Sequence, residues 1–182
     1  QETAFCRGLS RRLKSVYVGG GTPLVPTEAD LCRVLEAAAP FAADAGEYTV
    51  EAGRPDVFTD EKLQLLKDYG VTRICVNPQS FCDATLERIG RRHTGADIYR
   101  AYEMAQKFGF DVNFDLIAGL TGETCEEFEE SVDRAIALSP ENITVHTLCL
   151  KKGAQLKEEE SFLNVERIQE MIAYSRERLN ES

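Results

Sequence analysis

The sequence predicts an α/β protein with about five parallel strands and flanking helices. Short β-branched, apolar runs alternate with amphipathic segments of helical length, and glycine or proline stands at most of the transitions. This alternation is typical of right-handed βαβ units around a parallel sheet. The run Val16–Val18 is apolar without clean alternation, so we expect both faces of the sheet to be covered.

We expect five strands and a series of helices between them. The expected strands are 15–18, 48–51, 73–77, 112–117 and 142–148. The expected helices are 1–14, one starting at Thr27, 59 or 60 to 70, 83–89, 96–108, 124–138 and 165–179. Thr27 has the character of an N-cap, Gly70 and Gly109 of C-terminal caps, and Pro78 of a strand end.

The composition is that of a soluble globular domain. The 182 residues are 43% hydrophobic and 29% charged, with a formal net charge of −10. A body this acidic repels phosphate backbones, so a nucleic-acid partner is disfavoured. A local cationic cluster can still oppose the net charge and bind a small anion; it comprises Arg88, Arg91, Arg92 and His93.

We expect a cytoplasmic protein with no membrane partner. No stretch approaches the roughly 18 apolar residues of a spanning helix, and no signal-peptide pattern opens the sequence. The cysteines form no C-x-x-C pair, which disfavours a disulfide framework or a zinc site. We interpret them mainly as reduced, small apolar residues of the interior; they are Cys6, Cys32, Cys75, Cys82, Cys125 and Cys149.

Polar residues stand where successive strands are expected to end. Glu51, Gln79 and Asp115 occupy these places on the second, third and fourth strands, and parallel α/β folds bind ligands at the carboxyl ends of strands. A salt-bridged or solvated strand end explains any one of them. Three in succession favour a site, and carboxylates with an amide suit ribose hydroxyls and an ammonium group.

A glycine-rich loop, Gly19-Gly20-Gly21-Thr22-Pro23, follows the first strand. Glycines let a backbone approach a ligand closely and adopt positive φ. The loop has no third glycine in the dinucleotide-binding position and no Lys-Ser/Thr ending of a phosphate loop. A tight structural turn explains the run equally well, and both interpretations stay open.

Together these segments resemble the radical SAM family of oxygen-independent coproporphyrinogen III oxidases, and most closely its Z-type coproporphyrinogen dehydrogenase branch. The resemblance runs from about residue 15 to 150 in the right order and spacing. It rests on VYVGGGTP (16–23), VEAGRPD (50–56), NPQS (77–80), IGRRHT (89–94), NFDLIAGL (113–120) and TVHTL (144–148). It implies a partial (β/α) radical SAM barrel.

The resemblance also implies a site for S-adenosyl-L-methionine (SAM). In it Gly20, Gly21 and Thr22 would hold the methionine end, and Arg91 would pair with the carboxylate. Its amino and ribose groups would bind to Glu51, Gln79 and Asp115, with the backbone of Cys149 beside the adenine. A guanidinium binds a carboxylate bidentately, although an exposed helix-end cation is the other interpretation of Arg91. His93 fits the branch pattern without a role.

One departure from the family pattern concerns the iron–sulfur cluster. The family holds a [4Fe–4S] cluster on a C-x-x-x-C-x-x-C loop, and this sequence has no such motif; Cys75 and Cys82 have the wrong spacing. We therefore expect residues 1–182 to be a partial barrel domain whose cluster loop and first strand precede it and whose downstream domain follows it. Its open sheet edge would be fragile or would associate, and the chain alone would be inactive.

The implied reaction is the oxidative decarboxylation of two propionates of coproporphyrinogen III to vinyl groups, giving protoporphyrinogen IX in haem biosynthesis. The reduced cluster would cleave SAM to a 5′-deoxyadenosyl radical that removes the hydrogen, so no catalytic acid or base is assigned. The implied partners are a porphyrinogen substrate and an electron donor for the cluster. Two alternatives are a haem chaperone on the same barrel and a non-catalytic barrel fragment that docks a partner.

Overall fold

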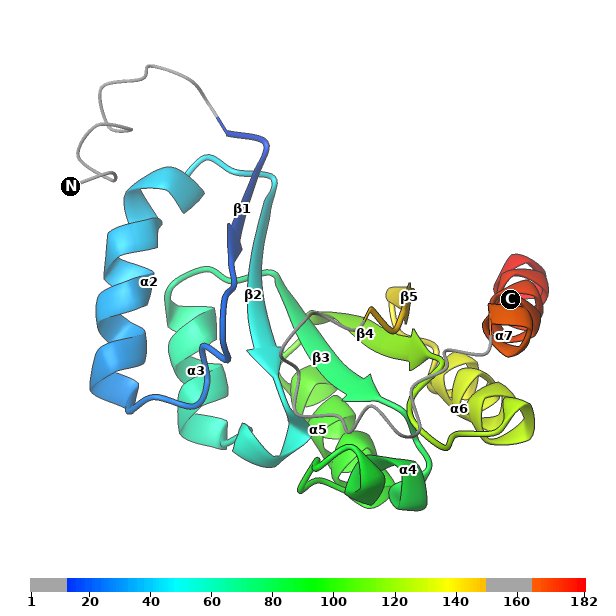
Figure 1. The fold of residues 1–182 in the computed structure, drawn as a ribbon. Coiled ribbons are helices and arrows are strands. Elements are labelled where there is room, and N and C mark those ends of the chain that lie inside the picture. The colour runs from blue at the N-terminus through cyan, green and yellow to red at the C-terminus, as the bar shows by residue number, and fades with distance from the viewer. Residues whose placement is uncertain (1–12, 150–164) are drawn as a thin grey trace. The chain divides into compact units, whose positions relative to one another are not determined.

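The computed structural model describes residues 13–149 and 165–182, and its described strands join in one sheet in the order β1-β2-β3-β4-β5 (Figure 1). The pairs β1–β2, β2–β3 and β4–β5 are parallel. The consecutive order is that of a (β/α) barrel, and it confirms the predicted fold class. The strands are β1 (Ser15–Val18), β2 (Glu47–Gly53), β3 (Arg73–Gln79), β4 (Asp111–Ala118) and β5 (Asn142–Thr147).

Helices connect the strands, as predicted, and three of those described begin after a capping threonine. Thr27, Thr59 and Thr124 each accept a backbone N–H of the following helix, and Thr124 completes a capping box with Glu127. Gly70 and Gly109 both have positive φ where a helix ends. The helices are α2 (Glu28–Ala42), η1 (Pro55–Val57), α3 (Asp60–Asp68), α4 (Asp83–Arg88), α5 (Gly95–Lys107), α6 (Cys125–Leu138) and α7 (Val165–Glu181).

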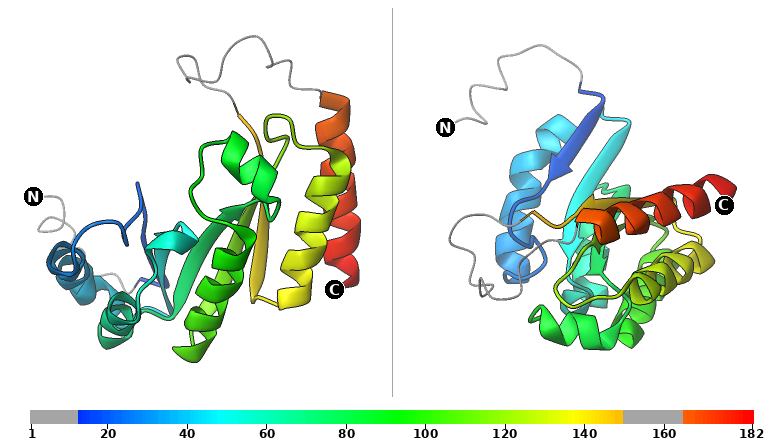
Figure 2. Two further views of the ribbon diagram at one scale, coloured as in Figure 1. Left: turned by 90° about the horizontal axis from the view of Figure 1, so that it is seen from below. Right: turned by 45° about the vertical axis from the view of Figure 1, so that its right-hand side comes forward.

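The chain forms two compact units, each with its own apolar core. One comprises Gln1–Val76 with Ala101–Val112, and the other Asn77–Arg100 with Asn113–Ser182. In the first unit α2 packs against β1 and α3, over fully buried residues that include Leu35, Val50, Leu63, Leu66 and Ile74. In the second unit α6 lies beside α7 (Figure 2), with buried residues that include Phe114, Phe128, Val132, Ala135 and Met171.

The expectation that both faces of the strands are covered does not hold for β1 and β4. In β4 the residues Val112, Phe114 and Leu116 are fully buried, whereas the alternate residues Asp115 and Ile117 keep partial exposure. Tyr17 of β1 is 60% exposed, between two less exposed valines. Because successive side chains of a strand point to opposite faces, β1 and the second half of β4 each have one face that is less buried than the other, whereas three successive residues are buried in β2 and in β3. In β1 and β4 the less buried face is available for polar side chains.

One further expectation, on the end of β3, is wrong, and two others fall outside the described residues. β3 does not end at Asn77: it continues through Pro78 to Gln79. A proline lacks only the N–H donor and keeps its carbonyl, and the strand ends where Gln79 turns to a φ of 71°. The expected N-terminal helix at 1–14 lies almost wholly outside the described residues, as does the charged run 151–160. Among the described residues no helix is both long and apolar enough to cross a bilayer.

The end of β2 is fitted against the glycine-rich loop. Gly53 has a φ of 83°, and a Cβ at this position would lie 2.4 Å from Thr22 Cγ2. This distance is far inside van der Waals contact, so a glycine is required both for the backbone conformation and for the approach of Thr22. The contact holds the loop after β1 beside the end of β2.

This contact gives a stability prediction. We expect Gly53→Ala to lower the free energy of unfolding by about 2–4 kcal/mol, because backbone strain and the collision with Thr22 add. Gly70→Ala is the matched control: Gly70 has a φ of 78° but open space around its would-be Cβ, so only the strain remains, about 1–2 kcal/mol. Denaturant titration of both variants measures the difference. Equal losses would show that Thr22 does not pack against Gly53.

Candidate functional site

In the first unit, the glycine-rich loop and β2 meet through a direct hydrogen bond. The backbone N–H of Gly20 donates to Glu51 Oε2 over 3.2 Å, although 31 residues separate the two along the chain. Gly20 and Gly21 both have positive φ, 94° and 67°, a conformation that side chains with a Cβ rarely adopt. The structure therefore brings Gly20 next to Glu51, and it brings Thr22 next to Gly53, near the end of the same strand. Gly20, Thr22 and Glu51 are predicted site residues, and the remaining one of this unit, Gly21, lies in the same loop.

In the second unit, Gln79 ends β3 in a strained conformation. Its φ of 71° is unusual for a residue with a side chain, and the residue is only 7% exposed. Its amide oxygen Oε1 is buried and has no hydrogen-bond partner among the described residues. An unsatisfied buried acceptor costs free energy, and strained residues concentrate at functional sites. Gln79 thus has the features of a residue that completes its hydrogen bonds with a ligand.

A buried histidine ties the Arg91 loop to the same strand end. His93 is 2% exposed, and its Nε2 lies 3.1 Å from the carbonyl oxygen of Pro78, the neighbour of Gln79. The backbone N–H of Arg91 donates to Leu86 O at the end of α4. These two contacts hold the segment 91–93 at both ends. They give His93 a positioning role that the sequence alone did not reveal.

Asp115 belongs to a polar face of β4 and β5. Asn113 Nδ2 donates to Asp115 Oδ1 over 2.7 Å, and His146 Nε2 lies 3.9 Å from the same oxygen. Thr144, the register partner of Asp115, donates its hydroxyl to Asn113 Oδ1 over 2.9 Å. Asn142 also donates to Asn113. The carboxylate of Asp115 is therefore oriented by neighbours on its own face of the sheet.

Two of the predicted residues lie at places other than those expected. Glu51 and Asp115 are not at strand ends: β2 continues to Gly53 and β4 to Ala118. Both residues lie within their strands and keep partial exposure. Cys149 is exposed and lies two residues beyond β5. The backbone N–H of its neighbour Leu148 donates to Ala118 O, beside the end of β4.

The residue that sequence reasoning missed is Glu123, in the loop between β4 and α6. Its side chain is fully buried, and Ser80 Oγ lies 2.7 Å from its Oε1. Burial raises the pKa of this carboxyl to about 7; the hydrogen bond from Ser80 opposes the shift, and the charge of Glu127 adds to it. Glutamate in a Gly-Glu-Thr turn before a helix reads as an exposed residue, so no local signal marks its burial.

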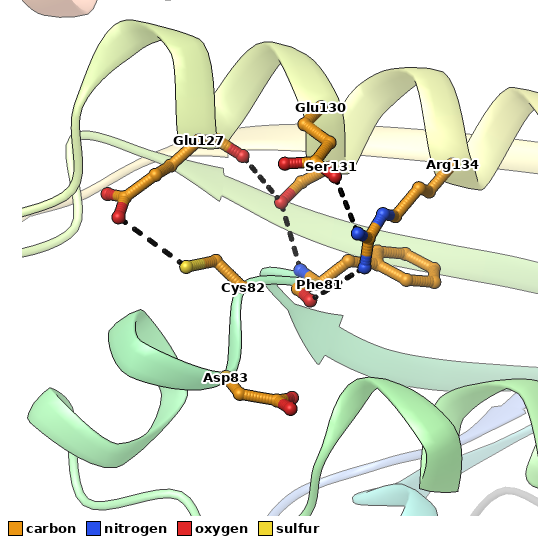
Figure 3. A pocket seen from close by; sticks show the side chains of 7 residues that line it. All are labelled: Phe81, Cys82, Asp83, Glu127, Glu130, Ser131 and Arg134. Atoms are coloured by element: carbon orange, nitrogen blue, oxygen red, sulfur yellow. Dashed lines mark hydrogen bonds and ion pairs between the residues drawn. The ribbon is translucent and has the colours of Figure 1, made fainter.

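A pocket of about 200 Å³ lies between α6 and the residues that follow β3 (Figure 3). Its polar groups already have partners: Arg134 donates to Glu130 and to the carbonyl of Phe81, and Asp83 accepts the backbone N–H of Gly95. Glu127 accepts from Thr124 N–H and faces the Cys82 thiol. With its charges paired in this way, the pocket is a poor candidate for the main site.

The described residues do not supply a cluster site. No group of three or more His, Cys, Asp or Glu side chains is arranged to hold a metal among residues 13–149 and 165–182, and the sequence has no C-x-x-x-C-x-x-C motif. The donor set therefore does not fit a [4Fe–4S] cluster. Gln79 offers an unsatisfied amide oxygen in the second unit, and in the first unit the glycine-rich loop has backbone at positive φ.

Several known proteins are similar to this chain in sequence. The protein named oxygen-independent coproporphyrinogen-III oxidase-like protein HemZ of Bacillus subtilis is 40% identical over 149 residues, covering 80% of this chain and 30% of that protein. The heme chaperone HemW of the same organism is 36% identical, covering 76% of this chain and 38% of that protein. The chain thus spans about a third of the length of these curated relatives.

The fold comparison agrees. The solved structure of coproporphyrinogen III oxidase (HemN) from Escherichia coli, described as a radical SAM enzyme, superposes with a TM-score of 0.72 over 92% of this chain and 41% of that chain, at 24% identity. At that identity the likeness concerns the fold. The family model of the radical SAM superfamily matches residues 6–135, most of the sequence. The chain belongs to the radical SAM superfamily.

Proposed function

We propose that the chain is the SAM-binding part of an oxygen-independent coproporphyrinogen III dehydrogenase. The whole protein would convert two propionates of coproporphyrinogen III to vinyl groups and yield protoporphyrinogen IX for haem biosynthesis, in the cytoplasm. The proposal is supported by membership of the radical SAM superfamily and by the similarity to a protein named as coproporphyrinogen-III oxidase-like. The substrate and the electron donor belong to the proposal.

The single observation that carries SAM binding is the state of Gln79. A buried amide oxygen without a partner among the described residues, on a backbone held at positive φ, is costly unless a ligand donates to it. The ammonium and ribose hydroxyls of SAM are donors of the required kind. We assign this oxygen to one of those groups.

We assign the remaining predicted residues to other groups of SAM. Gly20, Gly21 and Thr22 hold the methionine end through their backbone, and Arg91 pairs with its carboxylate, because a guanidinium presents two parallel donors. Glu51 and Asp115 accept from the ammonium and ribose groups, and the backbone at Cys149 borders the adenine. Glu51 then exchanges its bond from Gly20 for a charged partner.

When bound to a reduced cluster, SAM supplies the radical chemistry that removes a propionate hydrogen. The chain's own residues bind and orient the cofactor and exclude water, which is the protein's part in cofactor chemistry. Among the described residues none is assigned as a proton donor or acceptor for the reaction. The cluster ligands are not supplied by the described residues and must be found elsewhere in a functional protein.

A second candidate function is haem delivery. The similarity to the heme chaperone HemW of Bacillus subtilis supports it about as well as the oxidase assignment is supported. We propose the same SAM site for both candidate functions, so the residues of this site do not distinguish the oxidase from the haem chaperone. The difference lies in what happens to the tetrapyrrole.

The first prediction concerns SAM affinity in the full-length protein with its cluster reconstituted. We expect Arg91→Ala or Asp115→Ala to weaken SAM binding at least tenfold, about 1.4 kcal/mol, because each removes a charged partner of the cofactor. Equilibrium dialysis with labelled SAM measures it. Arg92→Ala and Asp111→Ala are matched controls, both at exposed neighbouring positions, and should bind as the wild type. Unchanged affinity in both test variants would refute the site.

A further prediction concerns the 182-residue chain by itself. Because it carries no C-x-x-x-C-x-x-C motif, we expect no 5′-deoxyadenosine after incubation with iron, sulfide, reductant and SAM. Liquid chromatography with mass spectrometry of the reaction mixture makes the measurement, with the full-length protein treated in the same way as the positive control. Detection of 5′-deoxyadenosine from the short chain would contradict our interpretation of its cysteines.

The last prediction separates the two candidate functions. With coproporphyrinogen III, SAM, a reductant for the cluster and an acceptor for the electron that remains as each carbon dioxide leaves, we expect the full-length protein to release two molecules of carbon dioxide for each protoporphyrinogen IX formed. The Arg91→Ala variant should lose this activity, whereas Arg92→Ala should keep it. Stoichiometric haem binding without any decarboxylation would instead establish the chaperone function.

A further inference from the structure

Glu123 is the end of a buried chain of hydrogen bonds in the second unit. Ser80 Oγ lies 2.7 Å from Glu123 Oε1 and 3.2 Å from Ser131 Oγ. Ser131 Oγ in turn lies 2.9 Å from the carbonyl oxygen of Glu127, one helical turn before it in α6. Ser80, Glu123 and Ser131 are all at most 1% exposed. The chain therefore runs from the β4–α6 loop to α6 across the end of β3.

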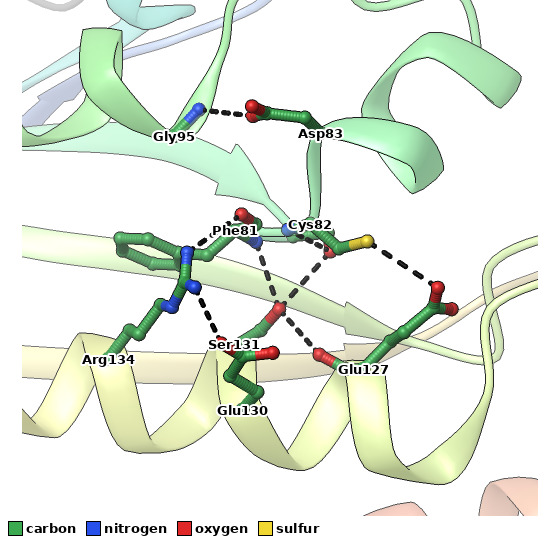
Figure 4. Close-up of polar contacts among 9 residues, drawn as sticks. Phe81, Cys82, Asp83, Gly95, Glu127, Glu130, Ser131 and Arg134 are labelled. Atoms are coloured by element: carbon green, nitrogen blue, oxygen red, sulfur yellow. Dashed lines mark hydrogen bonds and ion pairs between the residues drawn. The ribbon is translucent and has the colours of Figure 1, made fainter.

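These hydroxyls hold the turn that follows Gln79. Ser131 Oγ accepts the N–H of Phe81 over 2.9 Å, and Ser80 Oγ accepts the N–H of Cys82 over 3.1 Å. Figure 4 shows Ser131 between Glu127 on one side and the backbone of Phe81 on the other. The Phe81 ring packs edge-on against Phe114. The residue directly before these anchors is Gln79, whose positive φ needs such support.

The number of protons in this series of hydrogen bonds indicates that Glu123 is neutral when all three contacts are formed. Three contacts, Glu123 to Ser80, Ser80 to Ser131 and Ser131 to the Glu127 carbonyl, each need one proton. Two serine hydroxyls supply two. With Glu123 charged, Ser80 donates to Glu123 Oε1 and Ser131 to the Glu127 carbonyl, which leaves the contact between the two hydroxyls without a proton. When Glu123 is protonated, its carboxyl donates to Ser80 instead, and the Ser80 hydroxyl is then able to donate to Ser131. The second oxygen of Glu123 is buried without a hydrogen-bond partner among the described residues, which an uncharged acid tolerates better.

We propose that Glu123 is a positioning residue of the SAM site: as a neutral acid it holds Ser80 and Ser131 in the arrangement that keeps Gln79 in its binding conformation. The proposal rests on the proposed function, because it assigns Gln79 to SAM. Glu123 touches neither cofactor nor substrate, so its effect passes through the turn. Ser131, at the other end of the hydrogen-bond chain, lines the pocket of Figure 3.

The charges around Glu123 set the pH range in which the proton is held. Burial and Glu127 of α6 favour the neutral form, whereas Ser80, Arg88 of α4 and Arg167 of α7 favour the charged form. The balance raises the pKa to about 7 from 4.5. Between pH 4.5 and about pH 7, Glu123 therefore holds a proton in the folded protein and has lost it in the unfolded protein. The free energy of unfolding falls as the pH rises from about 4.5 to about 7.

The first test does not involve SAM. Amide hydrogen exchange at Phe81 and Cys82 reports the two N–H groups that the serines accept. In the full-length protein at pH 6 we expect Glu123→Ala to speed exchange at both amides about three- to tenfold, as for the loss of one buried hydrogen bond. Glu123→Gln should keep wild-type exchange, because its amide can donate to Ser80. Ser131→Ala is a second variant that acts from the other end of the chain.

The second test measures SAM affinity between pH 6 and pH 8. We expect the wild type to bind SAM about three- to tenfold less tightly at pH 8, where Glu123 is charged and one contact has no proton. Glu123→Gln should lose this pH dependence, since an amide does not titrate in this range. Glu177→Gln, an exposed glutamate of α7, is the matched control and should keep the wild-type profile.

The outcomes separate the two proposals. Faster exchange in Glu123→Ala together with weaker SAM binding supports the positioning role. Unchanged exchange at Phe81 and Cys82, or a Glu123→Gln variant with the wild-type pH profile, overturns it even if SAM binds normally. A wild-type protein that does not bind SAM at any pH overturns the proposed function itself, and with it the assignment of Gln79.

Discussion

The alternation of side chains along a parallel strand is the constraint on which this site depends. In β4, Phe114 lies on a buried face, and the alternate positions of the strand point the other way. On that other face Asp115 lies beside His146 of β5, and in β2 Glu51 keeps partial exposure. A carboxylate in the middle of a strand would be costly on the covered face. On the other face it is a group available to a ligand.

Much of the fold could be predicted because its signals are local. Threonine caps such as Thr124 and glycines such as Gly70 mark helix ends within a few residues, and the structure bears them out. The extent of β3 was not predictable from a local rule: proline cannot donate to the ladder and is rare inside central strands, yet β3 continues through Pro78 to Gln79. The open face was missed because Val16–Val18 looks uniformly apolar, and only tertiary packing shows that Tyr17 is exposed.

The candidate site shows a similar division. Motif resemblance named Gln79 and Arg91, yet it said nothing about how they are held. The structure adds the contact of His93 with Pro78 and the anchoring of Phe81 by Ser131. Such supporting contacts join residues far apart in the sequence and involve ordinary residue types. No pattern of spacing in the sequence predicts these contacts, so they can be recognised only once the fold is known.

The features that make this site fit a ligand are also those that make it costly. Gln79 combines positive φ with a buried, unsatisfied oxygen, and Glu123 buries a carboxyl nearby. A protein selected for stability alone would have glycine at the first position and an apolar residue at the second. Such strain persists where a function uses it. We propose the same SAM site for both candidate functions, propionate oxidation and haem delivery, so this cost is common to them. What distinguishes the two must lie in the groups that contact the tetrapyrrole.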